Sequence, residues 1–453
     1  MAMQRERLSD PDWAWAAYEP DAERPWTLAQ AGHLYRRAAC GATWEQLQQA
    51  LSDGPQRTID KLLKPQAEVV AFNTKYDQYE TSTTSISDLR AWWLRRMIQT
   101  PHPLLEKMTL FWHSHFATSG SAVQNVSLMR QHIRLLRRQA LGSFGILLEG
   151  VSRDPAVFLW LGADANRKAL PNDNFVRPFM ETFTIGPDHC TEKDIQEAAR
   201  AFTGWFVLRG QLRYIPREQD DGVKHILGRE GDFTSDDVVR ILLEQPATSR
   251  RVVRKLYRWL ISETEEPNAD LIVPLSESFA KDYNVLGLTE KMLRSNLFFS
   301  SAAYRQRIKS PVEFALGVVK GLEGVVSTTH LAQDLAALGQ NLYYPPTVKG
   351  WTGGRYWMDS ASVVGRYNLA LALLRDSGPY EKKLNPRIVV EKYACSTVES
   401  ASKLLLELFL QGDVDPGVRE MLSKTIRTKG DGSDASLRRF THGVITLPEF
   451  HLA

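Results

Sequence analysis

Hydrophobic residues along most of the chain recur every three or four positions, which is the period of one face of an α-helix. Helix starts are marked by residues whose side chains bind a free N–H of the first turn. Thr43 with Gln46 and Ser310 with Glu313 fit this pattern, and Pro311 takes the first helical position, where proline is tolerated. Few segments alternate with the period of two that strands show. The pattern predicts a mainly α protein, with one large multi-helix domain and only a minor β-hairpin element.

The hairpin is expected at 206–215, where two short apolar runs flank Arg209 and Gly210. Residues 73–87 contain few aliphatic side chains and are predicted to form an exposed loop.

Three regions are expected along the chain. Residues 1–26 are polar and contain proline, which predicts an N-terminal arm. Residues 27–375 form the main helical domain, and 376–453 form a C-terminal helical lobe packed on it. Hydrophobic residues make up 43% and charged residues 24%, as in ordinary folded proteins.

Charge and cysteine usage exclude several classes of protein. The 56 basic and 53 acidic residues nearly cancel, so we expect no nucleic-acid partner. Cys40, Cys190 and Cys395 lie far apart and form no CxxC pair, so neither a zinc ribbon nor a disulfide framework is indicated. No apolar run is long enough to span a membrane, and the first thirty residues lack the apolar core of a signal peptide. These features predict a soluble, cytoplasmic protein.

Two stretches, 109–119 and 153–205, place many polar side chains beside aromatic ones. Buried polar groups need hydrogen-bond partners, so such mixtures suggest that the groups meet one another. We therefore expect 112–119 to lie against 172–181 and the two to line one polar cleft.

His113 and His115 are the first candidates for ligand binding. Positions two apart on a helix point about 200° apart, so both could bind one metal only on a distorted segment. His115 shares a face with Phe111 and Trp112, which also fits a hydrogen-bonded core histidine. His113 lies on the other face and is the better placed of the two to reach polar groups.

Asn172, Asn174, Arg177 and Glu181 form a second candidate group. They could contact a ligand, or the asparagines could cap a helix while Arg177 pairs with Glu181 one turn away. His189 follows a Gly-Pro turn and could be a base, a ligand or only a surface residue.

Two loops complete the candidates. Asp220 and Asp221 would suit a hard cation or acid–base work, and they would equally suit a plain turn. Lys349, Trp351 and Arg355 lie in a glycine-rich aromatic loop, where tryptophan could offer a flat face to a sugar or anchor the loop. No phosphate loop, HExxH or dinucleotide motif is present, so the sequence assigns no catalytic residue, no cofactor and no metal.

Nine motifs follow one another through the chain: RRAACGAT, LEKMTLFWHSHFATS, SRDPAVFLWL, PNDNFVRPFMETFTIG, EAARAFTGW, DDGVKHILG, YRQRIKSPVEF, PPTVKGWTGG and LPEF. In this order they resemble the bacterial family catalogued as domain of unknown function 1800, with spacers similar to those of planctomycete members. The resemblance covers roughly 27–453. Two positions depart from the family pattern: Pro178 stands where the family has Glu, and Gln219 where it tends to have His.

The resemblance implies no activity, because the family has none established. It implies a partner, since family genes often stand beside a second family that resembles sulfatases and alkaline phosphatases. It also implies that many relatives are exported.

Two hypotheses follow, and they leave open whether the protein is an enzyme. The first is a binding or scaffold protein that acts with such a partner, on glycans. The alternative is a metal-assisted hydrolase whose polar cleft is built from the segments of His113/His115, 172–181, His189 and Asp220/Asp221. Three or more of these side chains within metal-bonding reach of one point would favour the enzyme, and dispersed side chains would favour the scaffold.

Overall fold

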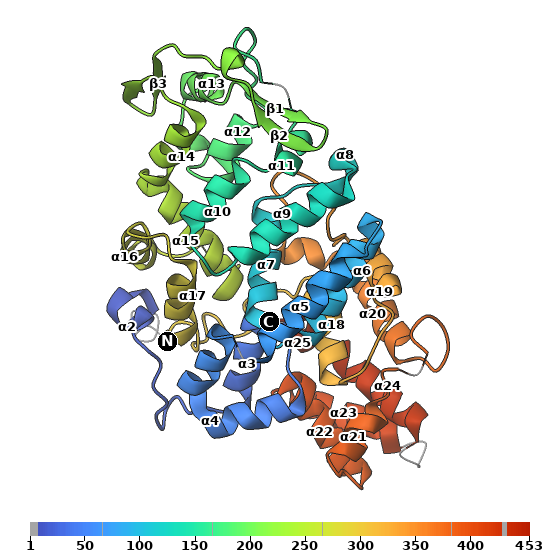
Figure 1. Cartoon of the computed structure of the whole chain (residues 1–453). Helices are drawn as coiled ribbons and strands as arrows, with labels where there is room; N and C mark the ends of the chain where they lie inside the picture. The colour runs from blue at the N-terminus through green and yellow to red at the C-terminus, as the bar shows by residue number, and fades with distance from the viewer. Residues whose placement is uncertain (1–7, 66, 165, 265, 382, 428–432) are drawn as a thin grey trace.

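The computed structural model describes residues 8–65, 67–164, 166–264, 266–381, 383–427 and 433–453. Figure 1 shows a chain whose secondary structure is mainly helical, which confirms the mainly α fold predicted from hydrophobic spacing. Strand within the described residues is confined to two small antiparallel pairs.

The predicted hairpin is one of these pairs. Strand β1 (Trp205–Leu208) pairs antiparallel with β2 (Gln211–Tyr214). Arg209 and Gly210 form the two-residue turn, with positive φ angles of 53° and 72°. Positive φ at both central positions matches the right-handed twist of the flanking strands, which is why short hairpins use such turns.

The second pair, β3 (Lys224–Ile226) and β4 (Arg229–Gly231), comes from the glycine-rich connection that follows the hairpin. Lys224 Nζ donates to Asp232 Oδ1 at 2.9 Å and to the Gly222 carbonyl oxygen at 2.9 Å. These contacts hold the small sheet together at its open end.

The helices fall into three successive groups. The first group comprises α2 (Pro11–Trp15), α3 (Leu28–Ala38), α4 (Trp44–Leu63), α5 (Glu68–Thr81), α6 (Ile86–Gln99), α7 (Pro103–His115), α8 (Gly120–Val123), α9 (Val126–Arg138), α10 (Phe144–Val151) and α11 (Pro155–Trp160). The second comprises α12 (Val176–Pro178), η1 (Phe179–Phe183), η2 (Pro187–His189), α13 (Glu192–Ala201), η3 (Pro216–Glu218), α14 (Ser235–Leu243), α15 (Pro246–Leu260), α16 (Ala269–Phe279) and α17 (Val285–Arg294). The third comprises α18 (Pro311–Gly321), α19 (Thr328–Ala337), η4 (Gly354–Trp357), α20 (Ser360–Leu374), α21 (Pro386–Lys392), α22 (Val398–Leu410), α23 (Pro416–Arg427), α24 (Asp434–Ile445) and α25 (Pro448–His451).

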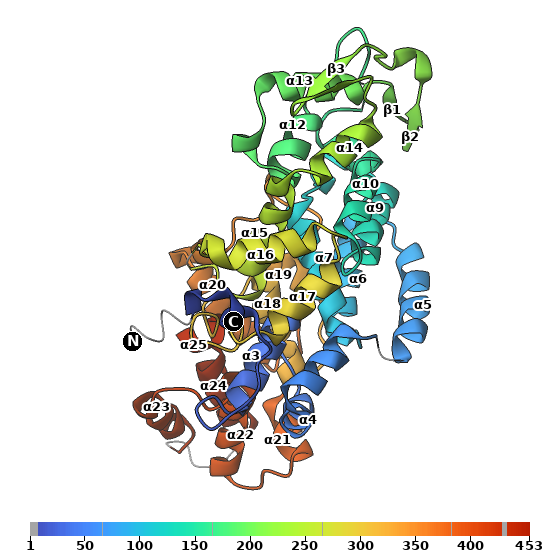
Figure 2. The ribbon, with the colours of Figure 1, turned by 90° about the vertical axis from the view of Figure 1, so that its left-hand side faces the viewer.

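The molecule is elongated, and helices from all three groups meet in its middle part. In Figures 1 and 2, α13, α14 and both strand pairs form one end, and α21 to α24 form the other. Helices α7, α15 and α18 lie between the two ends in both views. The last residues return to this middle part, where the Ala453 N–H donates to the Arg307 carbonyl oxygen at 2.7 Å.

The loop predicted at 73–87 is wrong over most of its length, because α5 occupies it to Thr81. Aromatic side chains supply the packing that aliphatic ones usually supply. Phe72 and Tyr76, one turn apart, stack with ring centroids 4.3 Å apart, and Trp92 Nε1 donates to the Tyr76 carbonyl oxygen.

Helix α7 runs through the core and is buried along most of its length. Two adjacent residues of this helix, Glu106 and Lys107, carry opposite charges and are both buried. Glu106 accepts from Arg96 at 2.6 Å and from Arg137 at 3.1 Å, while Lys107 pairs with Glu313 at the start of α18. Buried charges are tolerated only when they are paired in this way, so these contacts fix where α7 lies against its neighbours.

Among the helices that the structure describes, none combines the length and the apolar character needed to cross a lipid bilayer.

Candidate functional site

A cavity of about 440 Å³ opens between α7, α15 and the loop at 347–353. It brings together three parts of the chain that are far apart in sequence. The walls contain both tryptophan rings and polar side chains. The principal lining residues are Ser114, His115, Lys255, Arg258, Trp259, Glu263, Arg307, Ser310, Gln340, Thr347, Lys349, Trp351, Thr352 and Trp357.

Gly350 sets how closely the loop approaches α7. Its φ is +76°, a value that glycine adopts without strain. A Cβ at this position would lie 2.1 Å from the carbonyl oxygen of Ser114 and 2.6 Å from its Oγ. The loop backbone therefore lies directly on the last turn of α7, which only glycine permits.

His113 anchors the same loop region from inside the core. Its Nε2 accepts from the Tyr343 backbone N–H at 3.0 Å, and its ring packs against that of Trp351 at an interplanar angle of 69°, with centroids 5.3 Å apart. The side chain is fully buried, and burial with the nearby His132 lowers its pKa to about 3. His113 is thus a neutral core residue that supports the cavity wall from behind.

His115 faces the cavity and binds Lys255. Its Nε2 lies 3.1 Å from the Phe183 carbonyl oxygen, which only accepts hydrogen bonds, so Nε2 carries the ring proton. Nδ1 is then an acceptor, and Lys255 Nζ donates to it at 2.9 Å. We expected 112–119 to lie against 172–181, whereas this hydrogen bond runs to Phe183, two residues beyond that segment.

Lys255 has an unusual setting for a lysine. It is partly buried on α15, one turn after Arg251, and within the part of the chain described here no carboxylate lies within ion-pair distance of it. Burial and the adjacent Arg251 lower the pKa of its amine to about 7. The same burial, together with these two cations, holds the pKa of His115 well below its ordinary value. The pair therefore combines a neutral imidazole with an amine whose pKa lies well below that of an ordinary lysine.

A buried ion network supports another part of the cavity wall. Arg307 forms a bidentate pair with Glu313, at 2.6 and 2.8 Å, and Lys107 pairs with the same carboxylate. Burial alone would raise the pKa of Glu313, but the two cations outweigh it and hold that pKa below the ordinary value. Arg307 also lies over the Trp259 ring, with its Cζ 4.2 Å from the centroid, and so fixes the orientation of that ring.

Three further polar side chains face the cavity and keep hydrogen-bond donors or acceptors available for a ligand. Gln340 Oε1 accepts from the Val312 N–H at 2.9 Å, which leaves its amide hydrogens for other partners. Glu263 Oε1 accepts from the Ile308 N–H at 2.5 Å, which leaves its second oxygen. Lys349 is exposed in the loop. The cavity therefore offers donors and acceptors beside its aromatic walls.

The asparagines near the start of α12 lie elsewhere and support a turn. Asn172 Oδ1 accepts from the Asn174 N–H at 2.8 Å, and Asn172 Nδ2 donates to the Gly162 carbonyl oxygen at 3.0 Å. The Asn172 N–H in turn donates to Asn166 Oδ1 at 2.8 Å. These bonds give Asn172 a structural role in the turn, but not the helix cap that was expected as an alternative, because the N-cap residue of α12 is Phe175.

Arg177 is the centre of an acidic cluster on the surface. Its guanidinium forms ion pairs with the carboxylates of Asp173 and Glu192, each at 2.7 Å, and lies 3.5 Å from the carboxylate of Glu181. The expected pairing of Arg177 with Glu181 is present but is the longest of these contacts. His189 is exposed on the short turn η2.

The aspartate pair forms a turn with separate ion pairs. Asp220 bonds Arg200 at 2.8 and 3.0 Å and accepts from the Gly222 N–H at 2.9 Å. Asp221 pairs with Lys168 on the surface. Arg355 is exposed on η4, beyond the residues that line the cavity.

Of the twelve candidates, His115, Lys349 and Trp351 line the cavity. Within the described residues no group of three or more His, Cys, Asp or Glu side chains is placed to hold a metal ion. The metal-assisted alternative therefore gains no ligand set from this arrangement.

Sequence reasoning missed Lys255, Trp259, Arg307 and Glu313 as site residues. Glu313 was recognised as a capping residue, and its Oε2 does accept from the Ser310 N–H at 2.7 Å. Its second role depends on Arg307, six residues before it, and on Lys107 from the distant helix α7. For Lys255 the signal was weak: it lies beside the apolar stripe of a basic helix, where lysine is common.

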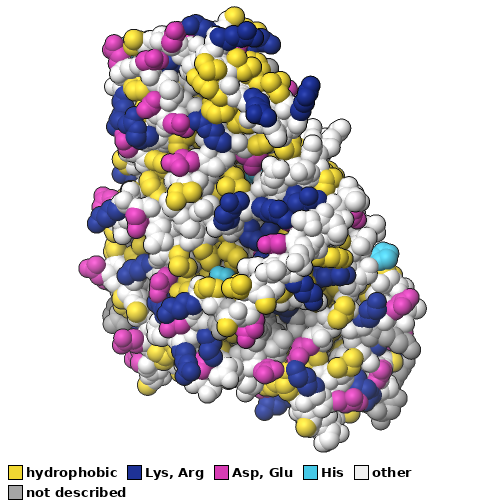
Figure 3. Space-filling view, viewed as in Figure 1, with side chains coloured by type: hydrophobic (Ala, Val, Ile, Leu, Met, Phe, Trp, Pro, Cys, Tyr) yellow, Lys and Arg dark blue, Asp and Glu magenta, His cyan; other side chains and the backbone are white. Residues whose placement is uncertain are grey.

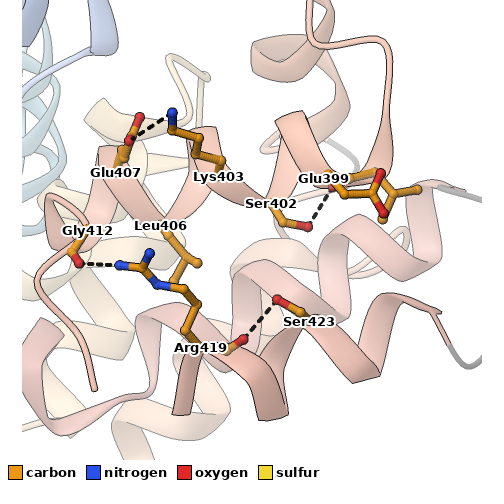
Figure 4. Close-up of a pocket in the computed structure, with 9 residues that line it drawn as sticks. Glu399, Ser402, Lys403, Leu406, Glu407, Gly412, Arg419 and Ser423 are labelled. Atoms are coloured by element: carbon orange, nitrogen blue, oxygen red, sulfur yellow. Dashed lines mark hydrogen bonds and ion pairs between the residues drawn. The ribbon is translucent and has the colours of Figure 1, made fainter. Parts of the chain in front are cut away.

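A second depression lies in the C-terminal part, between α22 and α23 (Figure 4). Its charged groups are already engaged. Arg419 Nη2 donates to the Gly412 carbonyl oxygen at 2.6 Å, and Lys403 lies 3.8 Å from Glu407. This groove is therefore a weaker candidate than the cavity at α7.

Comparison with known proteins identifies a family and no function. The family model described as "Protein of unknown function (DUF1800)" matches residues 33–452. No curated protein and no solved structure matches the chain.

Proposed function

The chain belongs to the DUF1800 family, and we propose that it is a saccharide-binding protein whose ligand occupies the cavity between α7, α15 and the loop at 347–353. The observation that carries this proposal is the pairing of aromatic and polar groups on the cavity walls. Trp259 and Trp351 are both partly exposed there, so each has ring surface available to a ligand. Sugar rings present C–H groups on their faces and hydroxyls at their edges, and this wall matches both.

The tryptophans are held in place before any ligand arrives. Arg307 fixes Trp259 from one side, and His113 packs against the ring of Trp351. Gly350 keeps the loop against α7. A pre-organised wall lowers the entropy lost on binding, so the cavity is built to bind a ligand without large rearrangement.

The polar groups match sugar hydroxyls in kind. Hydroxyls both donate and accept, and the cavity supplies the Gln340 amide, the Glu263 carboxylate and the Lys349 ammonium. Lys349 at the exposed side also favours saccharides that carry sulfate or carboxylate groups, since a charged partner strengthens the hydrogen bond.

The proposed role fits a binding component that presents a glycan to a partner of the sulfatase or alkaline-phosphatase type. In such a pair the partner supplies the chemistry, and this chain supplies affinity for the substrate. Co-purification of the two proteins with and without the glycan would test the association separately from saccharide binding.

The binding proposal is tested by a melting-temperature screen of the full chain against neutral, carboxylated and sulfated oligosaccharides. A true ligand raises the Tm by an amount that grows with its concentration, because it binds only the folded state. We expect at least one member of the panel to do so. A panel that leaves the Tm unchanged at millimolar concentration would contradict the proposal.

A further inference from the structure

We infer that the Lys255 amine is a nucleophile that forms an imine with the open-chain carbonyl group of a saccharide bound in the cavity. The inference deepens the proposed function and rests on it for the class of ligand. It assigns a covalent role to a side chain that simple binding does not require.

The position of the amine is the first support. Lys255 lines the cavity, and its Nζ is held at 2.9 Å from His115 Nδ1. Because the His115 Nε2 proton is used on the Phe183 carbonyl oxygen, Nδ1 can only accept. One N–H of the amine is therefore directed at His115. A neutral amine held in this way keeps its lone pair free for a carbonyl carbon.

The charge around the amine is the second support. Arg251 lies one turn before Lys255 on α15, and within the described chain no carboxylate is paired with the amine. A buried ammonium without a counter-charge is costly, so the neutral form is favoured. Lysines activated for Schiff-base chemistry are typically desolvated and placed beside another cation, which is the arrangement here.

The proposed step balances without any oxidant or reductant. The neutral Nζ attacks the carbonyl carbon, a C–N bond forms, and the carbonyl π electrons move to oxygen, which takes up one of the two Nζ protons. The carbinolamine then loses its hydroxyl group together with the second Nζ proton as water, and the nitrogen lone pair forms the C=N bond of the imine. Hydrolysis reverses the sequence and releases the saccharide unchanged.

The reactivity of the Lys255 amine towards a carbonyl group is tested with D-glyceraldehyde as the probe. The full chain is incubated with the aldehyde and sodium cyanoborohydride at pH 7, and the reduced adducts are mapped by peptide mass spectrometry. We expect Lys255 to be modified at least about tenfold faster than the exposed Lys349, because an ordinary lysine with a pKa near 10.4 is almost fully protonated at this pH. Equal or slower modification of Lys255 would overturn the inference.

The pH profile gives a second readout. Modification of Lys255 should level off above about pH 7, while that of Lys349 keeps rising towards pH 10. The charged or titratable groups that share the cavity wall with Lys255 or contact it are His115, Arg251, Arg258, Glu263, Arg307 and Lys349. Parallel profiles for the two lysines would contradict the inference. In Lys255→Met, which removes the amine without adding a permanent buried charge, the adduct at this position should disappear while the Tm stays close to that of wild type.

The two proposals fail in different ways. A saccharide that raises the Tm while Lys255 stays unreactive towards glyceraldehyde would leave the binding function standing and overturn the imine. A reactive Lys255 that no reducing oligosaccharide protects from glyceraldehyde would contradict the saccharide ligand. Protection by a reducing oligosaccharide, with imine trapping by cyanoborohydride in the absence of glyceraldehyde, would support both.

Discussion

Lys255 Nζ lies 2.9 Å from His115 Nδ1, so a hydrogen bond joins α15 to the last residue of α7 in the cavity wall. The bond has a fixed direction, because the other nitrogen of His115 donates to a backbone carbonyl oxygen. Two residues that would ordinarily compete for protons are thereby given separate roles. The imidazole stays neutral and accepts, and the amine donates.

The Lys255 amine should make stability depend on pH between about 7 and 10.5. Its pKa is about 7 in the folded protein and about 10.5 when unfolded, so the unfolded chain binds more protons in this window. The free energy of unfolding contributed by this group therefore rises as pH increases from 7 to 10.5. In Lys255→Met this contribution should be absent. Urea denaturation of both proteins at several pH values measures the difference, and a difference that is constant with pH would show that the amine is not perturbed.

Gly350→Ala should disrupt the contact between the loop and α7. The added methyl group would meet the Ser114 carbonyl oxygen, in addition to the strain of a positive φ. Gly228→Ala is the matched control, since Gly228 has the same φ of +76° with no atom within 4 Å of its Cβ position. We expect the free energy of unfolding to fall by about 1 kcal/mol in Gly228→Ala, because of backbone strain alone, and by clearly more in Gly350→Ala. Equal losses of unfolding free energy in the two variants, measured by urea denaturation, would show that the close approach of Gly350 to Ser114 does not affect stability.

Glu313→Gln should destabilise the fold by about 3–5 kcal/mol, because it leaves Arg307 and Lys107 buried without a counter-charge. Asp221→Asn breaks a fully exposed pair with Lys168 and serves as the control, with no measurable change expected. Denaturation midpoints for the two variants give the comparison. A small loss of stability in Glu313→Gln would show that water solvates the buried ion pairs of Glu313 with Arg307 and Lys107.

Acid should destabilise the protein below about pH 6.5 through its buried histidines. The His113 pKa is about 3 in the folded state, against about 6.5 in the unfolded chain, so the unfolded state binds more protons between these values. Its contribution to stability is complete above pH 6.5 and is lost as pH falls towards 3. His113→Gln keeps an acceptor for the Tyr343 N–H and should reduce the change of unfolding free energy with pH between about 3 and 6.5. An unchanged slope would contradict the assignment of His113 as neutral.

Local features of this fold could be predicted because they depend on nearby residues. The hairpin at 205–214 follows from its turn, and the helix that begins at Pro311 follows from its cap. The role of Asp220 in a turn was among the expected alternatives for the same reason. Helix α5 was missed because its contacts use aromatic rings, which carry no clear helical period in so polar a segment.

The site itself could be predicted only in part. His115, Lys349 and Trp351 stood out as unusual residues in unusual local sequences. Lys255 did not, because its significance depends on the absence of a carboxylate partner among the residues that the structure describes. Glu313 likewise acquires its second role from cations that lie 206 and 6 residues away. Such relations between distant segments leave no local pattern.

The measurement that tests the central claim most directly is a calorimetric titration of wild type, Lys349→Ala and Arg355→Ala with the saccharide that stabilises wild type most. Both changes remove one exposed cation from the same glycine-rich loop, and only Lys349 lines the cavity. If the cavity is the binding site, Lys349→Ala should weaken binding by about tenfold, or roughly 1.4 kcal/mol, while Arg355→Ala binds like wild type. Equal affinities for all three proteins, or no saccharide that binds wild type, would contradict the account.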